Sequence, residues 1–414
     1  MDDAKTTWRR PVHAIRRLLI RPHRDIRLAL AVWGPLAVIC LASGPLLGRF
    51  GCYVEVHRWL TVWHSGLNVY ELNMAVDYPP NTLVFFSPVL FLPARHGAEL
   101  FAVLNVFVCI AAAWSIVALT SGYAGLSLSR SERLAYVLML LVWSPTRVGI
   151  WAGQTSPAMI LCCCLALRFS EASAVLAGIL LGIGASKPHV ALGFYLMAVY
   201  CRMWKTVGVA AVTASSAVCV YAWSVSRSPF EVIGQYVSTL LSVYGGPGFY
   251  RGEVDLRPFF VDLFGFGQYR IGESLYLLTT VATGVGLLYL AWRVRSRMGA
   301  AVWVLASGLT WTTAFLPVNR YGLTLIAPTV LLTLWRPKPS KFMLNVIAIV
   351  IAVIVADLPT LVRHGLLDWF PAPIAQLGPF AHYFDRFVIG SCLVISFAAL
   401  AQQARPTPTD PASV

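Results

Sequence analysis

The chain has 414 residues, of which 58% are hydrophobic and only 12% are charged. Too few charges remain to cover the surface of a soluble domain, so the composition excludes one and predicts an all-α, polytopic membrane protein. The net charge of +14 does not indicate a nucleic-acid-binding protein, because seven arginines crowd together ahead of the first apolar segment.

Residues 1–27 form this basic amino-terminal segment. Its arginines are Arg9, Arg10, Arg16, Arg17, Arg21, Arg24 and Arg27. Basic residues beside a spanning helix are retained on the cytoplasmic side of the membrane. We therefore expect the amino terminus to lie in the cytoplasm.

About twelve membrane-spanning helices are predicted between residues 28 and 403. Their approximate bounds are 28–48, 98–120, 134–150, 153–168, 173–186, 188–202, 205–224, 274–292, 299–317, 321–335, 342–362 and 386–403. With the amino terminus inside, every predicted inner loop is basic, as with Arg130 and Arg133 after the second segment. This bias predicts a multi-pass protein of the inner or plasma membrane, with the Pro-rich tail 404–414 also cytoplasmic.

Two outer loops, 49–97 and 225–273, are long. Within the first, Leu83–Pro93 is apolar but only about a dozen residues long, which is too short to cross a bilayer. We expect it to form a helix at the outer surface, because a spanning helix there would place Arg130 and Arg133 outside.

The stretch Val54–His64 in the same loop has the pattern of an amphipathic helix lying on the membrane surface. It carries Trp59 and Trp63, side chains that favour the boundary between membrane and water. We therefore expect both tryptophans at that interface.

Carboxylates of the first outer loop are candidates for acid–base chemistry. Glu55 lies on the predicted surface helix, and Asp77 is followed by Tyr78-Pro79-Pro80, where the two prolines stiffen the backbone. An outer carboxylate at bilayer depth can act as a general base toward a sugar or lipid hydroxyl. The alternative for each is a solvated loop acid, which is the reading we favour for Glu71.

Basic residues on the outer side are expected to have partners or a ligand, because the positive-inside bias acts against them. Lys187 and Arg320 flank helix breaks at outer ends, where they could bind a phosphate or diphosphate leaving group. Arg147 could assist them. Pairing with Asp255 or with Glu253 is the alternative.

Polar residues near these breaks complete the candidate site. Gln154 could hydrogen-bond sugar hydroxyls or merely cap a helix. His189 could touch a phosphate or play a structural part. Tyr78 and Asn319, which lie in the same outer motifs, are expected to contact substrate.

The sequence has no glycine-rich loop of the nucleotide-binding type and no Asp-x-Asp metal pair. Its nine cysteines lack metal-ligand spacing, and the Cys162–Cys164 triple reads as apolar helix packing. We expect no cofactor, although a divalent metal stays open. These features favour a lipid-phosphate donor delivered within the membrane plane.

The order of these motifs resembles the GT-C membrane glycosyltransferases. The acidic first loop, then Asp77-Tyr78-Pro79-Pro80, Gly153-Gln154 and Ser186-Lys187-Pro188 are most similar to glycosyltransferase family 87. That family contains bacterial polyprenyl-phosphate-mannose-dependent mannosyltransferases. The likeness covers residues 28–335, within a GT-C-like catalytic domain of 28–403.

The resemblance implies an inverting transfer of a hexose, most simply mannose, from a polyprenyl-phosphate carrier to a lipid or glycan acceptor on the outer face. An acidic residue of the first outer loop serves as base, a role that falls to Glu55 or Asp77. Many relatives have an aspartate near the end of the first span, where this chain has Cys52 and Tyr53. Lys187 matches the family's Lys-Pro element, which implies binding of the donor phosphate.

Two other functions fit parts of the pattern. Broken helices and charges at membrane depth are also found in transporters, so a lipid-linked sugar flippase is one alternative. A non-catalytic assembly protein that keeps the fold is the other.

Overall fold

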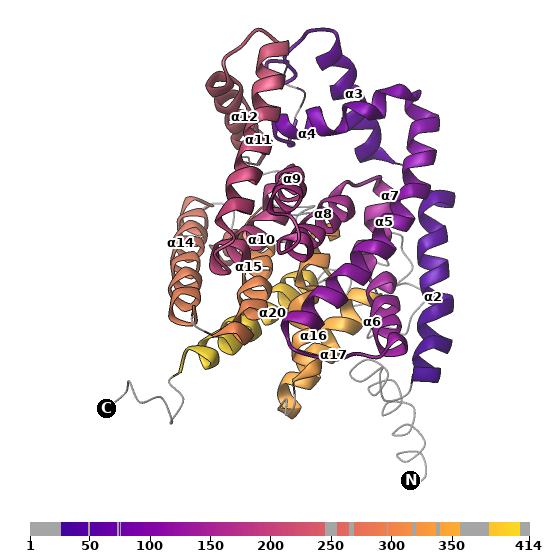
Figure 1. Ribbon diagram of the computed structural model, residues 1–414, viewed down its shortest axis with the longest axis vertical. Helices are drawn as coiled ribbons and strands as arrows, with labels where there is room; N and C mark the ends of the chain where they lie inside the picture. Colours follow the sequence, from indigo (N-terminus) through magenta and orange to yellow (C-terminus); the bar gives the residue numbers. More distant parts are fainter. Residues whose placement is uncertain are drawn as a thin grey trace.

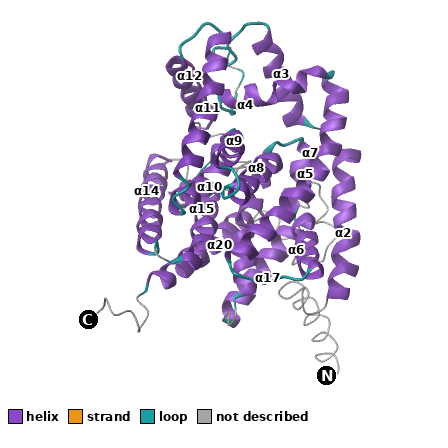
Figure 2. Ribbon diagram, in the orientation of Figure 1, coloured by secondary structure: helices purple, strands orange, loops and turns teal. Residues whose placement is uncertain are grey.

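The structure is a computed structural model that describes residues 26–48, 50–72, 74, 76–244, 255–264, 269–295, 297–316, 320–336, 340–356 and 381–405. This part of the chain consists of helices joined by turns and contains no strand (Figures 1 and 2). The all-α prediction is therefore confirmed for the described residues.

The α-helices, in chain order, are α2 (Ile26–Leu47), α3 (Gly51–His64), α4 (Pro80–Phe86), α5 (Ala94–Tyr123), α6 (Arg130–Val142), α7 (Ser144–Ala152), α8 (Ser156–Phe169), α9 (Ala174–Gly184), α10 (Pro188–Tyr200), α11 (Trp204–Ser224), α12 (Pro229–Tyr244), α13 (Arg257–Phe264), α14 (Tyr269–Arg293), α15 (Ala301–Phe315), α16 (Ala327–Trp335), α17 (Lys341–Ala356) and α20 (Ala381–Ala404). Short 3₁₀ helices are η2 (Ser87–Phe91), η5 (Met298–Ala300) and η6 (Arg320–Ile326).

Five of these helices are long and apolar enough to cross a membrane: α2, α5, α11, α14 and α20. The pair α6 and α7, bent by 60° at their junction, would add a sixth as one broken span. Each of the twelve predicted segments overlaps a helix, but the count of twelve spans is not confirmed. The reason is length, because the remaining apolar helices have 10–17 residues, whereas a full crossing needs about 20.

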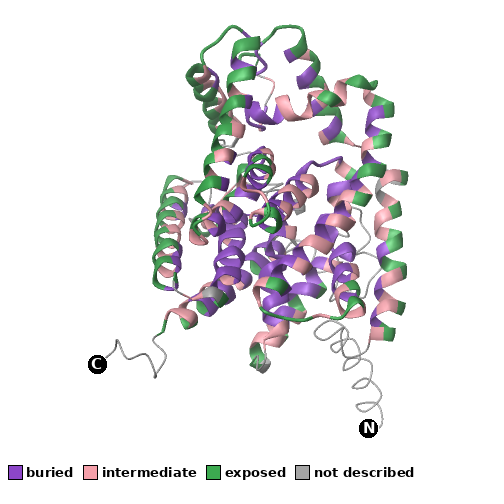
Figure 3. Cartoon of the chain, in the orientation of Figure 1, coloured by how far each residue is buried: buried purple, intermediate pink, exposed green. Residues whose placement is uncertain are grey.

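The outermost long helices show an apolar surface that water would not tolerate. In α2 and α14 only 17% of an apolar stretch of 18 residues is buried inside the protein. Most residues of both helices are exposed or of intermediate burial (Figure 3). On α14 the exposed side chains include Leu278, Val281 and Val285. Lipid is the environment in which such surfaces are stable, so the chain is a membrane protein.

The end of the molecule near α3 is formed by the first loop together with α12 and one end of α11 (Figure 1). Helix α3 includes the stretch Val54–His64 that was predicted as a surface helix, and α4 with η2 coincides with most of the predicted short helix Leu83–Pro93. The expectation for the tryptophans is wrong: Trp59 and Trp63 are 5% and 9% exposed. They are buried because Trp59 packs against the Tyr78 ring at 5.6 Å and Trp63 stacks on Tyr221 of α11 at 5.4 Å.

Close helix contacts in the bundle depend on glycine at particular positions. A Cβ added at Gly193 of α10 would lie 2.8 Å from the backbone nitrogen of Leu309 in α15. Backbone atoms cannot move aside as a flexible side chain can, so only glycine allows the two helices to approach this closely. The contact fixes α10 against α15, and both helices contribute to the cavity described below.

Gly193→Ala should therefore destabilise the protein by about 1–3 kcal/mol, as overpacked positions do. The matched control is Gly208→Ala on α11, where an added Cβ meets nothing within 4 Å and helix propensity improves by up to about 1 kcal/mol. Thermal denaturation in detergent measures both variants. Equal midpoints for the two would contradict the packing argument.

Candidate active site

A cavity of about 490 Å³ lies at the end of the bundle that carries the first loop. It is formed by the segment before α4, the turn between α9 and α10, α12, and the adjoining ends of α13, α14 and α15. Four charged residues line it, namely Asp77, Lys187, Arg257 and Glu273, and most other lining side chains are aromatic or aliphatic. The volume suits a small molecule or a sugar, since ligand pockets span roughly 300–1,000 Å³.

Lys187 is the buried cation of this cavity, with 3% of its surface exposed. It immediately precedes α10, which begins at Pro188, a residue suited to the first helical position because it has no N–H. The Lys187 Nζ donates to the Gln154 Oε1 at 2.7 Å and lies 4.7 Å from the centre of the Tyr78 ring. Burial lowers the pKa of Lys187 to about 8, while the nearby carboxylate of Asp77 opposes that shift.

Gln154 is held in a fixed position behind Lys187. Gly153 precedes it with a φ of 68°, a left-handed conformation that ends α7. The Asn105 Nδ2 donates to the Gln154 backbone oxygen at 3.0 Å, and the Gln154 Oε1 also accepts from the Tyr78 hydroxyl at 3.1 Å. The structure rejects the helix-cap alternative for Gln154, since its side chain bonds Tyr78, Lys187 and the Cys52 sulfur instead.

The two candidate bases occupy different positions. Asp77 is half-buried and lines the cavity, where Pro79 and Pro80 lead directly into α4. The hydroxyl of Tyr70 donates to the Tyr78 backbone oxygen at 2.7 Å, which fixes this segment. Glu55 is exposed on α3 and does not line the cavity. The structure thus brings Asp77, and not Glu55, into one cavity with Lys187.

The remaining predicted residues are placed in part. His189 lines the cavity, and its Nε2 has no hydrogen-bond partner among the described residues. Arg147 is half-buried in α7 and does not line the cavity. Asn319 lies outside the described residues, and for Arg320 only the backbone at the start of η6 is described.

An ion pair that the sequence did not predict also lines the cavity. The Arg257 Nε donates to the Glu273 Oε1 at 2.6 Å. The Asp255 carboxylate accepts the backbone N–H of Arg257 at 2.8 Å. Glu273 lies sixteen residues further along, on α14, and no motif in the sequence singles it out.

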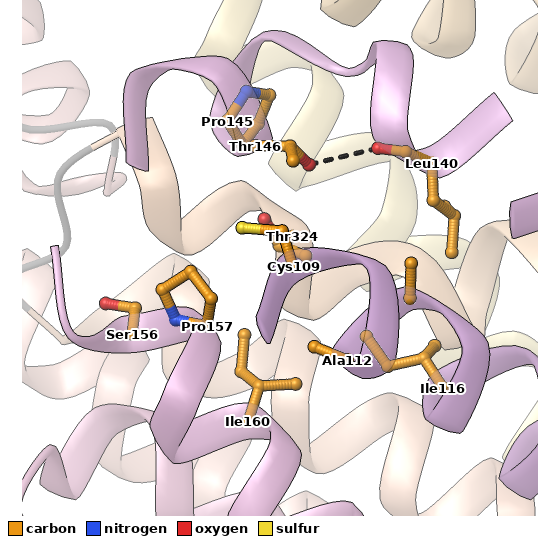
Figure 4. Close-up of a pocket in the computed structure, with 11 residues that line it drawn as sticks. Cys109, Ala112, Ile116, Leu140, Pro145, Thr146, Ser156, Pro157, Ile160 and Thr324 are labelled. Atoms are coloured by element: carbon orange, nitrogen blue, oxygen red, sulfur yellow. Dashed lines mark hydrogen bonds between the residues drawn. The ribbon is translucent and has the colours of Figure 1, made fainter. Parts of the chain in front are cut away.

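A second cavity, between α5, α6, α7 and α8, is much smaller, at about 20 Å³ (Figure 4). The Thr146 hydroxyl beside it donates to the Leu140 backbone oxygen at 3.0 Å. No charged side chain lines it, and its volume is that of about one water molecule. It therefore cannot hold a sugar.

The cavity that contains Asp77 and Lys187 has the side chains needed for group transfer from a phosphate ester. A buried ammonium can stabilise a departing phosphate, and a carboxylate beside it can remove a proton. Aromatic side chains, Tyr236 and Tyr276 among them, line the same space. Within the described ranges, no group of three or more His, Cys, Asp or Glu residues could hold a metal ion.

Comparisons with known proteins agree with this chemistry. Neither a curated protein nor a solved structure matches the chain. The profile described as "Glycosyltransferase family 87" matches residues 77–317, which is more than half of the chain. The match begins at Asp77, includes Gln154 and Lys187, and leaves Glu55 outside. On this evidence the chain belongs to glycosyltransferase family 87 and is a membrane glycosyltransferase.

Proposed function

We propose that the protein transfers a hexose, mannose in the simplest case, from a polyprenyl-phosphate donor to a hydroxyl of a lipid or glycan acceptor. The observation that carries the proposal is the buried Lys187, which faces the same cavity as Asp77. A buried ammonium is costly unless negative charge offsets the loss of water, and in the proposed complex the Asp77 carboxylate and the donor phosphate would both supply it. The absence of a nucleotide-type glycine loop from the sequence favours a lipid carrier.

In the proposed mechanism Asp77 accepts the proton of the acceptor hydroxyl while its oxygen attacks the anomeric carbon. The bond from that carbon to the phosphate oxygen breaks on the opposite face, so the anomeric configuration inverts. The electron pair leaves with the lipid phosphate, and Lys187 stabilises the resulting charge. Gln154 positions Lys187 by accepting its hydrogen bond. Glu55 is the alternative base.

We place the cavity on the outer face of the membrane, with both termini in the cytoplasm. Support comes from the basic loops, which all fall on the other side in this orientation. The cavity also adjoins α4, which belongs to the first outer loop of that topology.

The direct test uses the purified full-length protein in detergent with a panel of synthetic polyprenyl-phosphate hexoses. Release of polyprenyl phosphate together with a glycosylated product of inverted configuration is expected. A flippase or an assembly protein would release no polyprenyl phosphate. Turnover of a nucleotide sugar without any lipid donor would contradict the proposal.

The pH dependence gives a second test. Burial lowers the pKa of Lys187 to about 8, so its ammonium is present below that pH and is lost as the pH rises through it. The kcat/KM for the donor should therefore fall on the alkaline side with an apparent pKa near 8, because this ratio reports the free enzyme. Lys187→Arg, which stays charged, should lose that alkaline limb. An unchanged limb in this variant would assign it to another group.

A further inference from the structure

A cavity of about 820 Å³ lies at the opposite end of the bundle from the candidate active site. Helix α10 begins beside the first cavity at Pro188 and ends beside this one at Tyr200, while α15 runs the other way, from Ala301 to Phe315. The 13 residues of α10 rise about 20 Å. The two cavities are therefore separate sites.

Basic side chains dominate this second large cavity. Arg202, Lys205, Arg295 and Arg297 line it, against a single carboxylate, Glu171. Within the described parts of the chain, none of the four cations forms an ion pair with a carboxylate. The cavity therefore has an excess of positive charge.

The four cations differ in whether their charged groups contact other parts of the protein. Arg297 donates to the backbone oxygens of Gln403 and Arg405, and Arg295 lies over the Trp292 ring at 5.0 Å. Arg202 and Lys205, in contrast, make no hydrogen bond, ion pair or ring contact among the described residues, apart from the backbone bonds of their helix ends. Their charged groups are available to a ligand.

The turn that carries them has an unusual backbone. Arg202 has a φ of 57°, and its N–H and that of Met203 bond the oxygens of Val199 and Ala198 at 3.0 and 2.9 Å. Glycine is the usual residue at this position of a helix end, because a side chain strains the left-handed conformation. Lys205 lies in the first turn of α11, where the helix dipole attracts anions and disfavours a cation. A bound anion would offset the unfavourable placement of the Lys205 charge.

We propose that this cavity binds the phosphate-bearing headgroup of an anionic membrane lipid. The cavity opens at the ends of membrane helices, and Trp204, at its edge, is 60% exposed, as suits an aromatic residue at a bilayer surface. In the proposed topology this end faces the cytoplasmic leaflet, where basic pockets between helices meet anionic lipids. This site is distinct from the sugar-transfer site and does not depend on the reaction assigned there.

The test compares lipid binding by two double variants of the full-length protein, using native mass spectrometry of delipidated protein titrated with phosphatidylglycerol or phosphatidylcholine. Arg202→Asn with Lys205→Gln removes both available charges, and asparagine tolerates the left-handed backbone. The control, Arg130→Gln with Arg168→Gln, removes two exposed charges from the same end outside the cavity.

Wild type and control should bind phosphatidylglycerol more tightly than phosphatidylcholine, and the cavity variant should bind it roughly 10- to 30-fold more weakly. Glu171→Gln should tighten binding, a gain that a misfolded variant cannot produce. Equal losses in both double variants, or equal binding of the two lipids, would overturn the proposal. Displacement of the lipid by millimolar inorganic phosphate would show a free-anion site and overturn the assignment to a lipid.

Discussion

Replacing Asp77 with asparagine should lower kcat by about 10²–10⁴-fold, the usual contribution of a general base. Asparagine keeps the size of the side chain but cannot accept the proton of the acceptor hydroxyl. Donor binding should change little, because the lipid phosphate contacts Lys187 in the proposed mechanism. Single-turnover release of polyprenyl phosphate, measured at matched protein levels, tests this prediction.

The matched control is Glu55→Gln, which makes the same chemical change on the exposed face of α3. It should retain most of the activity, because Glu55 does not line the cavity. The opposite result, loss in Glu55→Gln with normal Asp77→Asn, would move the base to Glu55. Normal turnover in both would remove the carboxylate mechanism.

Lys187→Gln should lower kcat/KM for the donor by about 10²–10³-fold, the loss typical for removal of one group that stabilises developing charge. Glutamine can still reach Gln154 with a hydrogen bond, so the change mainly removes the charge. Lys187→Arg should recover part of the loss, because a guanidinium also binds phosphate. Donor titrations at a pH below 8 measure the effect while the lysine of the wild type is charged.

Arg168→Gln is the control for general loss of positive charge, since Arg168 is exposed and lines neither of the large cavities. The double variant Asp77→Asn with Lys187→Gln should lose less than the sum of the single losses, because the two groups share one cavity and one transition state. Strict additivity would show that they act independently. Wild-type kinetics in Lys187→Gln would exclude it from donor binding.

Around Gln154, the local turns could be predicted from the sequence, but the contact between them could not. The Gly153-Gln154 turn and the Lys187-Pro188 break were predicted, because glycine and proline act on the backbone locally. Whether Gln154 capped a helix or served the site stayed open. Its bond to Lys187 joins positions 33 residues apart, and no local pattern determines which turns meet at one end of a bundle.

The sequence also could not distinguish whether Asp77 or Glu55 lines the cavity. Both are acids of one loop, and both were candidates for the base on the sequence alone. The fold of α3 against α4 and α11 buries Trp59 and Trp63 and leaves Glu55 on the exposed face. Side-chain direction on a helix depends on what the helix packs against, which a surface-helix pattern alone could not supply.

Apolar runs and proline breaks are enough to identify the chain as a helical membrane protein, because they act through local hydrophobicity and backbone geometry. The sequence also indicates functional roles for Asp77 and Lys187, because a charged residue near the membrane is costly without a partner or a function. Three contacts could be seen only in the folded chain: Asp77 and Lys187 share a cavity, Glu273 pairs with Arg257, and Arg202 and Lys205 line a separate basic cavity. Such contacts arise where the ends of distant helices meet, and that meeting depends on the packing of the whole bundle.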